Sequence, residues 1–403
     1  MLNKTNTVYK SMDVAVIITL FNGEKWIRQT LESVLSQEHP PSEVVVVDDG
    51  SEDNSPEMVR AFSGVKLIRN PSKGAQSACN FGFQHTQAEL VTFLDHDDIW
   101  HPSHLRLMND ILEQHPECPA AIATCQLFES DDSLVFPPPK LNAIPFDPWE
   151  IFPVAKIPTN SAVVIRRTEM NKLGGWPIQF GGCTDTYTWQ RLSVTQPLIE
   201  NRTATVGYRQ HEQSMSIDLR SQQTLNYFQD AIATSEDALN YRLEIHPQDT
   251  DKLTNRLAFM KPMLNILEAT IHSDTQLLKE SFLAFEKCLV GESDAFIQLI
   301  VGQLIWFITP KLGMQAPRRK TELLKILIRR WLQEPENTYF TLLFRIQENL
   351  PIWTAWQYLL LQPQQINVWR LFIHVVKLRI LWNLIVLILI SYQFSNNKKR
   401  SQT

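Results

Sequence analysis

The sequence predicts a doubly wound, mostly parallel α/β sheet followed by an all-helical C-terminal region. Over the first hundred residues, short apolar runs rich in β-branched residues alternate with segments of helical periodicity, the order of repeated βαβ units. Beyond about residue 217, glycine becomes scarce and prolines separate long segments of helical spacing. The 403 residues are 44% hydrophobic and 20% charged, enough for two or three domains with a sizeable core.

The predicted elements follow one another in a regular order. Residues 14–20 form a nearly continuous apolar run, as expected for a parallel strand covered on both faces. Residues 24–37 have helical spacing, and a second strand covers residues 43–47. Further strands are expected over residues 65–68, 90–94 and 161–165, and helices from Ser55-Pro56, over residues 75–86 and over residues 185–194.

Three segments set the expected domain organisation: a domain over residues 1–216, a helical domain over 217–365 and a basic, apolar tail over 366–403. Residues 131–158 contain seven prolines and predict a long surface loop, either a lid on the substrate side or a plain linker. In the tail, residues 380–394 carry no charge and Lys398-Lys399-Arg400 follow. That stretch is shorter than the roughly 20 residues of a membrane span. An interfacial helix on a membrane surface and a buried helix remain equal alternatives.

Composition excludes several other classes of protein. The net charge is −5 and no run of lysine and arginine resembles a nucleic-acid-binding arm. The five cysteines are scattered without a C-x-x-C pair, which indicates neither a zinc site nor a disulfide framework and fits a reducing compartment. Residues 1–10 are polar and lack the apolar core of a signal peptide, so we expect a cytoplasmic protein.

Acidic residues follow two of the predicted strands at the points where those strands end. Asp48-Asp49 follow the second strand, and Asp95-His96-Asp97-Asp98 follow the fourth. Carboxylates this close repel one another unless a cation neutralises them, and open α/β sheets bind ligands at the carboxyl ends of their strands. The pattern predicts Mg²⁺ or Mn²⁺ held against the phosphates of a substrate. For Asp48-Asp49 a simple turn is an equal alternative, whereas a turn does not need three aspartates.

Taken in order, these motifs resemble those of the family 2 glycosyltransferases, which have the GT-A nucleotide-sugar-binding fold. The resemblance covers roughly residues 12 to 216 and leaves the C-terminal half unmatched. The motifs that carry it are residues 16–24, Val46-Val47-Asp48-Asp49-Gly50-Ser51, Asn70 through Gly74 to Asn80, Phe93-Leu94-Asp95-His96-Asp97-Asp98, and Tyr208-Arg209-Gln210-His211.

The resemblance implies a set of residues that bind the nucleotide-sugar. Asp48 resembles the acidic residue that recognises the base, usually uracil, and Glu24 resembles a glutamate that helps to hold the nucleoside. Phe21 stands where the family more often has tyrosine, so stacking is kept and a hydroxyl contact is lost. The full set is Thr19, Phe21, Asn22, Glu24, Asp48, Asp49, Gly74, Asn80, Asp95 and Arg209.

The resemblance also implies the metal and catalytic residues. Asp95 and Asp97 resemble the D-x-D pair, with Asp97 the more direct metal ligand, and His211 is the third candidate ligand. His96 occupies the variable middle position as a spacer. Asp185 resembles the acidic residue that deprotonates the acceptor, although the usual Glu-Asp pair is here Thr184-Asp185. An N-cap role for Asp185 is an alternative compatible with catalysis.

The implied reaction is the inverting transfer of a sugar from a nucleotide-diphospho-sugar, UDP-linked by resemblance, to a hydroxyl acceptor of a surface or lipid-linked glycan. Two alternatives remain. A sugar nucleotidyltransferase would need a glycine-rich basic loop after the first strand, which residues 21–24 do not supply. A non-catalytic sugar-nucleotide-binding scaffold would be favoured by loss of Asp97 or Asp185, and both are present. The sequence does not predict the oligomeric state.

Overall fold

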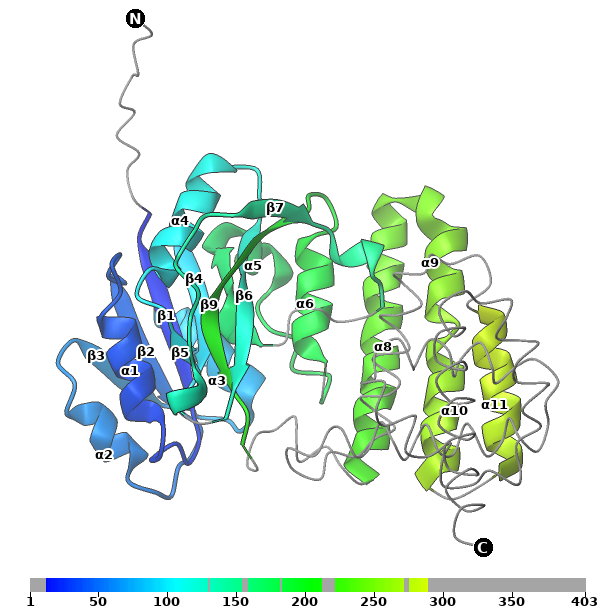
Figure 1. Ribbon diagram of the computed structural model, residues 1–403, viewed down its shortest axis with the longest axis horizontal. Helices are drawn as coiled ribbons and strands as arrows, with labels where there is room; N and C mark the ends of the chain where they lie inside the picture. Colours follow the sequence, from blue (N-terminus) through cyan, green and yellow to red (C-terminus); the bar gives the residue numbers. More distant parts are fainter. Residues whose placement is uncertain are drawn as a thin grey trace, which may run out of the picture. The chain divides into compact units, whose positions relative to one another are not determined.

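The computed structural model describes residues 12–129, 131–153, 159–181, 183–211, 222–271 and 275–288. All of these residues belong to one compact unit that ends at Gln315. They form a mixed nine-stranded sheet with helices on both faces, followed by a group of helices (Figure 1). The predicted α/β sheet followed by a helical region is confirmed. The domain boundaries expected at residues 216 and 365, and the tail, lie outside the described residues.

The parallel half of the sheet follows the predicted order of elements. Its strands are β1 (Val14–Leu20), β2 (Glu43–Asp48), β3 (Val65–Arg69) and β4 (Leu90–Asp95), arranged as β3-β2-β1-β4. All three pairings among them are parallel. The central strand β1 is buried along nearly its whole length, because its side chains are apolar on both faces and helices cover both.

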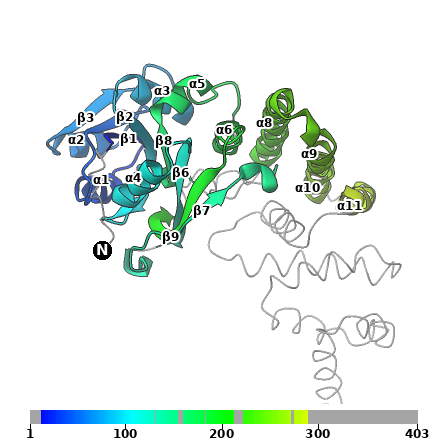
Figure 2. The same cartoon turned by 90° about the horizontal axis from the view of Figure 1, so that it is seen from above.

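Helices cover the two faces of this sheet in separate groups. Helices α1 (Ile27–Leu35) and α4 (His104–Gln114) lie on one face, and α3 (Ala75–Gln84) and α5 (Arg167–Leu173) lie on the other (Figure 2). The short α2 (Ser55–Arg60) begins at the predicted proline. Helix α1 buries Ile27, Leu31 and Val34, the i, i+4, i+7 stripe that its sequence predicts.

The other half of the sheet is mixed and was not predicted in detail. Strand β8 (Val163–Arg166) runs antiparallel to β4 and to β6 (Ala120–Phe128), and β9 (Leu198–Arg209) runs parallel to β6. Strands β5 (Ile99–Trp100) and β7 (Ala143–Phe146) both pair antiparallel with β9. The proline-rich segment is therefore more than a loop, since β7 lies within it. Among the described residues β7 pairs with β9 alone, and an edge strand of this kind tolerates a proline such as Pro145.

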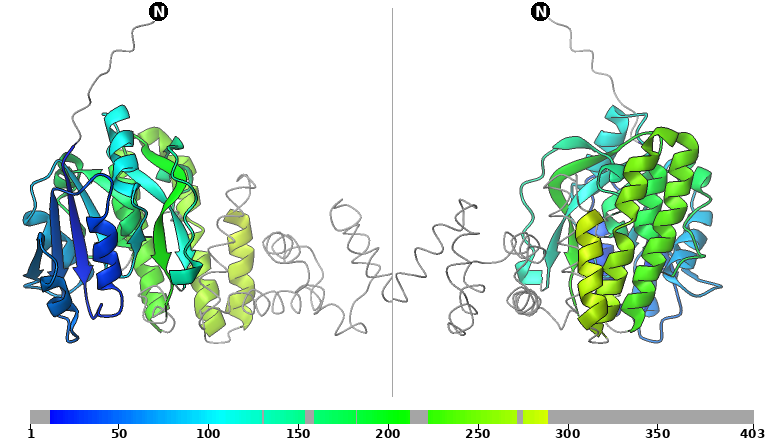
Figure 3. Two further views of the ribbon diagram at one scale, coloured as in Figure 1. Left: turned by 60° about the vertical axis from the view of Figure 1, so that its left-hand side comes forward. Right: turned by 90° about the vertical axis from the view of Figure 1, so that its right-hand side faces the viewer.

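The helical region begins beside helix α6 (Thr184–Leu192). It consists of α8 (Gln222–Ile245), α9 (Thr250–Leu257), α10 (Met260–Ile271) and α11 (Thr275–Cys288). Helix α8 packs against α6, α9 and α10, and α10 packs against α11 (Figure 3). Within the described ranges, no helix has both the length and the apolar character needed to cross a membrane.

Candidate active site

Two acidic strand ends flank the end of β1. Asp95 at the end of β4 lies opposite Thr19 in the strand register, and Asp48 at the end of β2 lies opposite Leu20. Because neighbouring strands are separated by about 5 Å, the two strand ends lie about 10 Å apart. The sheet therefore brings both acidic clusters to one edge, with β1 between them.

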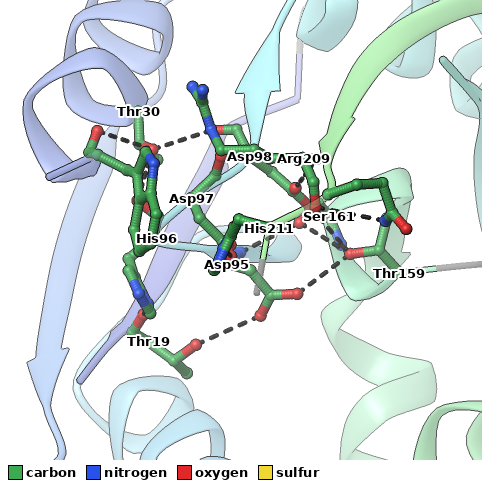
Figure 4. Close-up of polar contacts among 12 residues, drawn as sticks. Thr19, Thr30, Asp95, His96, Asp97, Asp98, Thr159, Ser161, Arg209 and His211 are labelled. Atoms are coloured by element: carbon green, nitrogen blue, oxygen red, sulfur yellow. Dashed lines mark hydrogen bonds and ion pairs between the residues drawn. The ribbon is translucent and has the colours of Figure 1, made fainter. Parts of the chain in front are cut away.

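Asp95 lies among hydroxyl groups in the centre of the site (Figure 4). The hydroxyl of Thr19 donates to Oδ1 over 3.5 Å, and that of Thr159 donates to Oδ2 over 3.1 Å. The Asp95 amide donates to Oγ of Ser161 over 3.1 Å. Burial and the charge of Asp97 raise the pKa of Asp95 to about 7, and the charge of Asp185 adds to this effect. The charges of Asp95 and Asp185, which are far apart in sequence, therefore act on each other.

Asp97 and His211 form a pair beside Asp95. Nε2 of His211 lies 2.7 Å from Oδ2 of Asp97 (Figure 4). The His211 imidazole stacks on Trp26 with ring centroids 3.9 Å apart. Burial opposes ionisation of Asp97, but the hydrogen bond from His211 and the neighbouring charges outweigh it and lower the pKa of Asp97. Asp97 therefore stays ionised next to a nitrogen donor.

The Asp97–His211 pair would suit a Mg²⁺ or Mn²⁺ ion that takes most of its ligands from water and substrate, rather than an ion held by protein side chains alone. Among the described residues, no three His, Cys, Asp or Glu side chains are grouped to hold an ion together. Mg²⁺ usually takes only one or two protein ligands and completes its shell with water and substrate phosphates. The carboxylates of Asp97 and Asp95 would supply such oxygen ligands, and His211 would add a nitrogen ligand once its hydrogen bond to Asp97 is replaced by the ion.

Asp98 has a structural environment. It is fully buried, and its Oδ1 accepts the amide of Arg209 over 3.0 Å while Oδ2 lies 3.1 Å from the hydroxyl of Thr159. Burial, together with the charges of Asp97 and Asp95, raises the pKa of Asp98 well above its usual range. A neutral carboxyl can donate to Thr159 while Thr159 donates to Asp95. Asp98 thus joins the end of β9 to the loop that carries Asp97.

His96 is held as part of the backbone framework. Its Nδ1 lies 3.1 Å from the carbonyl oxygen of Thr19, and a side chain at Gly23 would collide with its ring. The hydroxyl of Thr30 lies 2.8 Å from the His96 carbonyl oxygen and 2.9 Å from that of Asp98 (Figure 4). These contacts fit the expected role of His96 as a spacer.

Arg209 directs its guanidinium at protein groups. Nε donates to the carbonyl oxygen of Asp97, Nη1 to Asp131 and Nη2 to Oε1 of Gln29, each over 2.8 Å. The residue is only 4% exposed, and its guanidinium lies over the ring of Phe128. Arg209 therefore fixes the backbone at Asp97, and its expected role in donor binding stays a prediction.

The carboxylates at the end of β2 are engaged by hydrogen-bond donors. Oδ1 of Asp48 accepts the amides of Gly50 and Ser51 over 3.3 and 2.8 Å, and Oδ2 pairs with Arg69 over 2.9 Å. The carboxylate of Asp49 accepts the amide of Gly74 and, over 2.6 Å, the side chain of Asn70. The turn geometry that the sequence allowed is therefore present, and Asp49 ties the Gly74 loop to β2.

The loops after β1 and β2 hold each other. The amide of Asn22 donates to Oγ of Ser51 over 3.0 Å, and Oδ1 of Asn22 accepts the amide of Glu52. Oε1 of Glu24 accepts from the side chain of Asn54 over 3.0 Å. Phe21 between them is 54% exposed, so its ring is available for stacking on a planar ligand.

Asn80 connects α3 to the turn that precedes α6. Its Nδ2 donates to the carbonyl oxygen of Trp176 over 2.9 Å, and its Oδ1 accepts the Trp176 amide over 2.7 Å. One turn earlier on the same helix, Gln76 donates to Oγ1 of Thr184 over 2.9 Å. Asn80 therefore has a visible structural role, and its expected contact with the nucleotide-sugar stays a prediction.

Asp185 lies in the first turn of α6. The N-cap position is held by Cys183, which has a left-handed backbone with φ of 55°, so the N-cap alternative for Asp185 is wrong. One carboxyl oxygen accepts the amide of Thr186 over 2.6 Å. Burial raises the pKa of Asp185 above its ordinary value, which makes this carboxylate a better proton acceptor.

Sequence reasoning missed several residues of the site. Thr159 and Ser161 hold Asp95, Trp26 supports His211, and Gln29 and Asp131 hold Arg209. The only sequence signal was the polar triplet between Pro158 and the apolar run of β8. Trp26, Gln29 and Asp131 lie on segments that meet Arg209 and His211 only when the sheet forms.

Comparison with known proteins agrees with this geometry. Residues 15–183 match the family model described as glycosyl transferase family 2. The match contains the strand ends that carry Asp48 and Asp95, and it stops two residues before Asp185.

Two relatives illustrate the range of similarity. An uncharacterized glycosyltransferase of Nostoc sp. is 36% identical over 107 residues, which are 25% of this chain and 33% of that protein. Glycosyltransferase GlyG of Streptococcus pneumoniae is 34% identical over 91 residues, which are 21% of this chain and 30% of that protein. The matches to the first relatives thus span a third or less of those proteins.

Solved structures similar to this chain cover more of its length. TarS of S. aureus in complex with UDP-GlcNAc aligns with a TM-score of 0.49 and 17% identity, covering 84% of this chain and 93% of that one. The mannosyltransferase PcManGT of Pyrobaculum calidifontis, in complex with GDP-Man and Mn²⁺, aligns with a TM-score of 0.47 and 18% identity, covering 84% and 86%.

Proposed function

We propose that this chain transfers a sugar from a nucleotide-diphospho-sugar, UDP-linked, to a hydroxyl acceptor, with inversion at the anomeric carbon. The observation that carries the proposal is the Asp97–His211 pair beside Asp95 at the carboxyl end of β4, where the charge of Asp185 also acts on Asp95. This is the end of the sheet at which open α/β folds bind ligands.

On the donor side, the ring of Phe21 stacks on the base, and Thr19, Asn22 and Glu24 line the nucleoside site. Asp48 recognises the base. Its carboxylate has about four acceptor positions, of which Gly50, Ser51 and Arg69 use three, so one remains for an N–H of the base. Asp49, Gly74 and Asn80 shape the adjoining loop.

On the phosphate side, Asp97 and His211 hold Mg²⁺ or Mn²⁺, and Asp95 faces the ribose or shares the ion. The bound ion supplies positive charge against the charge that develops on the departing diphosphate. Arg209 contributes to donor binding by fixing the backbone carbonyl of Asp97. Trp26, stacked on His211, keeps the imidazole aligned with Asp97.

Asp185 takes the proton of the acceptor hydroxyl. The acceptor oxygen then attacks the anomeric carbon from the face opposite the diphosphate, so one bond forms as the other breaks and the configuration inverts. The raised pKa of Asp185 supports this role, because a base works best when its pKa approaches the working pH.

The test is turnover of nucleotide-sugars by the purified full-length chain. UDP-, GDP-, CDP- and dTDP-linked sugars are incubated with it, with and without Mn²⁺ or Mg²⁺, and released nucleoside diphosphate is measured. We expect metal-dependent release from a UDP-sugar that is lost in Asp97→Ala and Asp185→Ala. If no donor is turned over and none binds in a metal-dependent way, the proposal fails.

The composition of the C-terminal tail suggests where the acceptor is found. A basic segment without acidic residues, from residue 349 onward, suits a membrane surface with anionic lipids, which fits a glycan or lipid-linked acceptor at the cytoplasmic face. Deleting residues 380–403 is expected to release the protein from the membrane fraction of cell lysates. Unchanged fractionation would contradict the membrane assignment and leave the sugar-transfer proposal intact.

A further inference from the structure

Helix α6, which carries Asp185, is joined to α8 by a compact polar and aromatic cluster. The hydroxyl of Tyr187 donates to Oδ2 of Asp237 over 2.7 Å, and Nη1 of Arg191 donates to the same hydroxyl over 2.9 Å. The guanidinium of Arg191 lies 3.6 Å from the ring centroid of Tyr241 and 3.6 Å from Oδ2 of Asp237. Tyr187, Arg191, Asp237 and Tyr241 are called the α6–α8 cluster below.

The end of α6 is tied to the same helix. The carbonyl oxygen of Val194 accepts from Nη1 of Arg242 over 3.2 Å and lies 2.8 Å from Nε2 of His246. Below these contacts, a second hydrophobic core joins both sides of the junction, formed by Trp149, Phe152, Val194, Ala238, Leu239 and Leu253. The helical region therefore holds α6 both at its second turn and just past its last residue.

The opposite side of α6 is held by the sheet domain. Trp189 packs edge-on against Trp176, which in turn packs edge-on against Phe93 of β4. Gln76 of α3 holds Thr184, the residue before Asp185. Helix α6 is thus fixed between β4, where Asp95 ends the strand, and α8.

We propose that α8 positions the catalytic base, with Asp237 as a positioning residue that holds Tyr187 and Arg191 and so keeps in place the first turn of α6, which carries Asp185. Tyr187 lies two residues after Asp185, so a shift of Tyr187 moves the first turn of α6 directly. Arg191 lies six residues after Asp185, a little under two turns further along the helix. Displacements of about 1 Å at a reacting group are enough to slow an enzyme markedly. The inference rests on the proposed function for the role of Asp185.

The experiment compares Asp237→Ala with Glu236→Ala, an exposed carboxylate at the preceding position of the same helix. At saturating donor we expect nucleoside diphosphate release to fall about tenfold in Asp237→Ala, with binding of UDP and Mn²⁺ unchanged within about twofold. Asp237→Glu restores most of the rate because a carboxylate again reaches Tyr187. Glu236→Ala behaves as the wild type.

A double variant separates positioning from general damage. In an Asp185→Asn background the base is already absent, so Asp237→Ala is expected to cause no further loss of rate. A full additional tenfold loss would overturn the proposal, as would a wild-type rate in Asp237→Ala.

Amide hydrogen exchange gives a readout that does not need turnover. Asp237→Ala is expected to speed exchange in residues 184–192, and Glu236→Ala is not. Unchanged exchange in α6 would overturn the positioning of this helix by α8 even if no donor is ever found. Absence of turnover in the wild type would instead contradict the proposed function.

Discussion

The ends of β2 and β4 carry the same residue type at the same edge of the sheet, yet their environments differ. At β2, Asp48 and Asp49 accept hydrogen bonds from backbone amides, Asn70 and Arg69. At β4, Asp95, Asp97 and Asp98 lie within one turn, and the nearby Asp185 adds a fourth carboxyl. Carboxylates with enough donors stabilise a loop, whereas carboxylates that crowd one another store repulsion that a cationic ligand relieves.

The largest effect is expected from Asp185→Asn, which keeps the shape and removes the base. We expect the rate of sugar transfer at saturating donor to fall about 10³-fold, with donor affinity retained. Glu32→Gln, an exposed carboxylate on α1, is the control and should leave the rate unchanged. A loss of less than about tenfold would remove Asp185 from the catalytic role.

Asp97→Asn is expected to lower the rate about 10²-fold, because the amide replaces the charged ligand at the Asp97–His211 pair. A Mn²⁺ titration of both the rate and the binding of UDP measures it, and the midpoint should move to higher Mn²⁺. A Mn²⁺ dependence identical to that of the wild type would place the ion elsewhere.

The pH profile should report the crowded end of the sheet. Burial raises the pKa of Asp185, and the residue must be ionised to accept a proton. The rate is therefore full above this raised pKa and falls about tenfold for each pH unit below it. Initial rates at saturating donor, measured over a range of pH, show this acidic fall in rate, and Asp185→Asn should abolish the fall. If the fall in rate at low pH persists in that variant, it reports the pKa of another group.

Asp48→Ala tests how much the hydrogen bonds at the end of β2 contribute to the stability of the protein. Removing the acceptor for Ser51 and the partner of Arg69 is expected to lower the free energy of unfolding by about 1–2 kcal/mol, measured by urea denaturation. Asp48→Asn keeps the acceptor for the amides and should lose less. Equal stability of Asp48→Ala and the wild type would contradict the structural assignment.

The smallest effect is expected from Asp98→Asn. Burial and the charges of Asp97 and Asp95 raise the pKa of this carboxyl well above its usual range and so favour its neutral form. An amide of the same shape can also accept from Arg209 and donate to Thr159. Unfolding free energy should change by less than about 1 kcal/mol. A large destabilisation would mean that Asp98 is ionised in the folded protein.

Local sequence patterns predicted the parallel half of the sheet because each of its strands is apolar on both faces and lies next to its helix in sequence. Residues 14–20 and 43–47 agree with β1 and β2 almost to the residue. The mixed half was harder to predict. Strands β6 and β9 are paired across about 80 residues of sequence, and short strands such as β5 and β7 gain their definition from β9 rather than from their own composition.

The sequence by itself determined which carboxylates end strands and in which order the motifs occur, because strand periodicity and strand termini are local properties. Only the tertiary structure decided which carboxylates have a raised pKa, since the pKa depends on burial and on the charges nearby. It also decided that Arg209 faces protein groups and that the charge of Asp185 acts on Asp95. These contacts join residues far apart in sequence, and no local pattern encodes them.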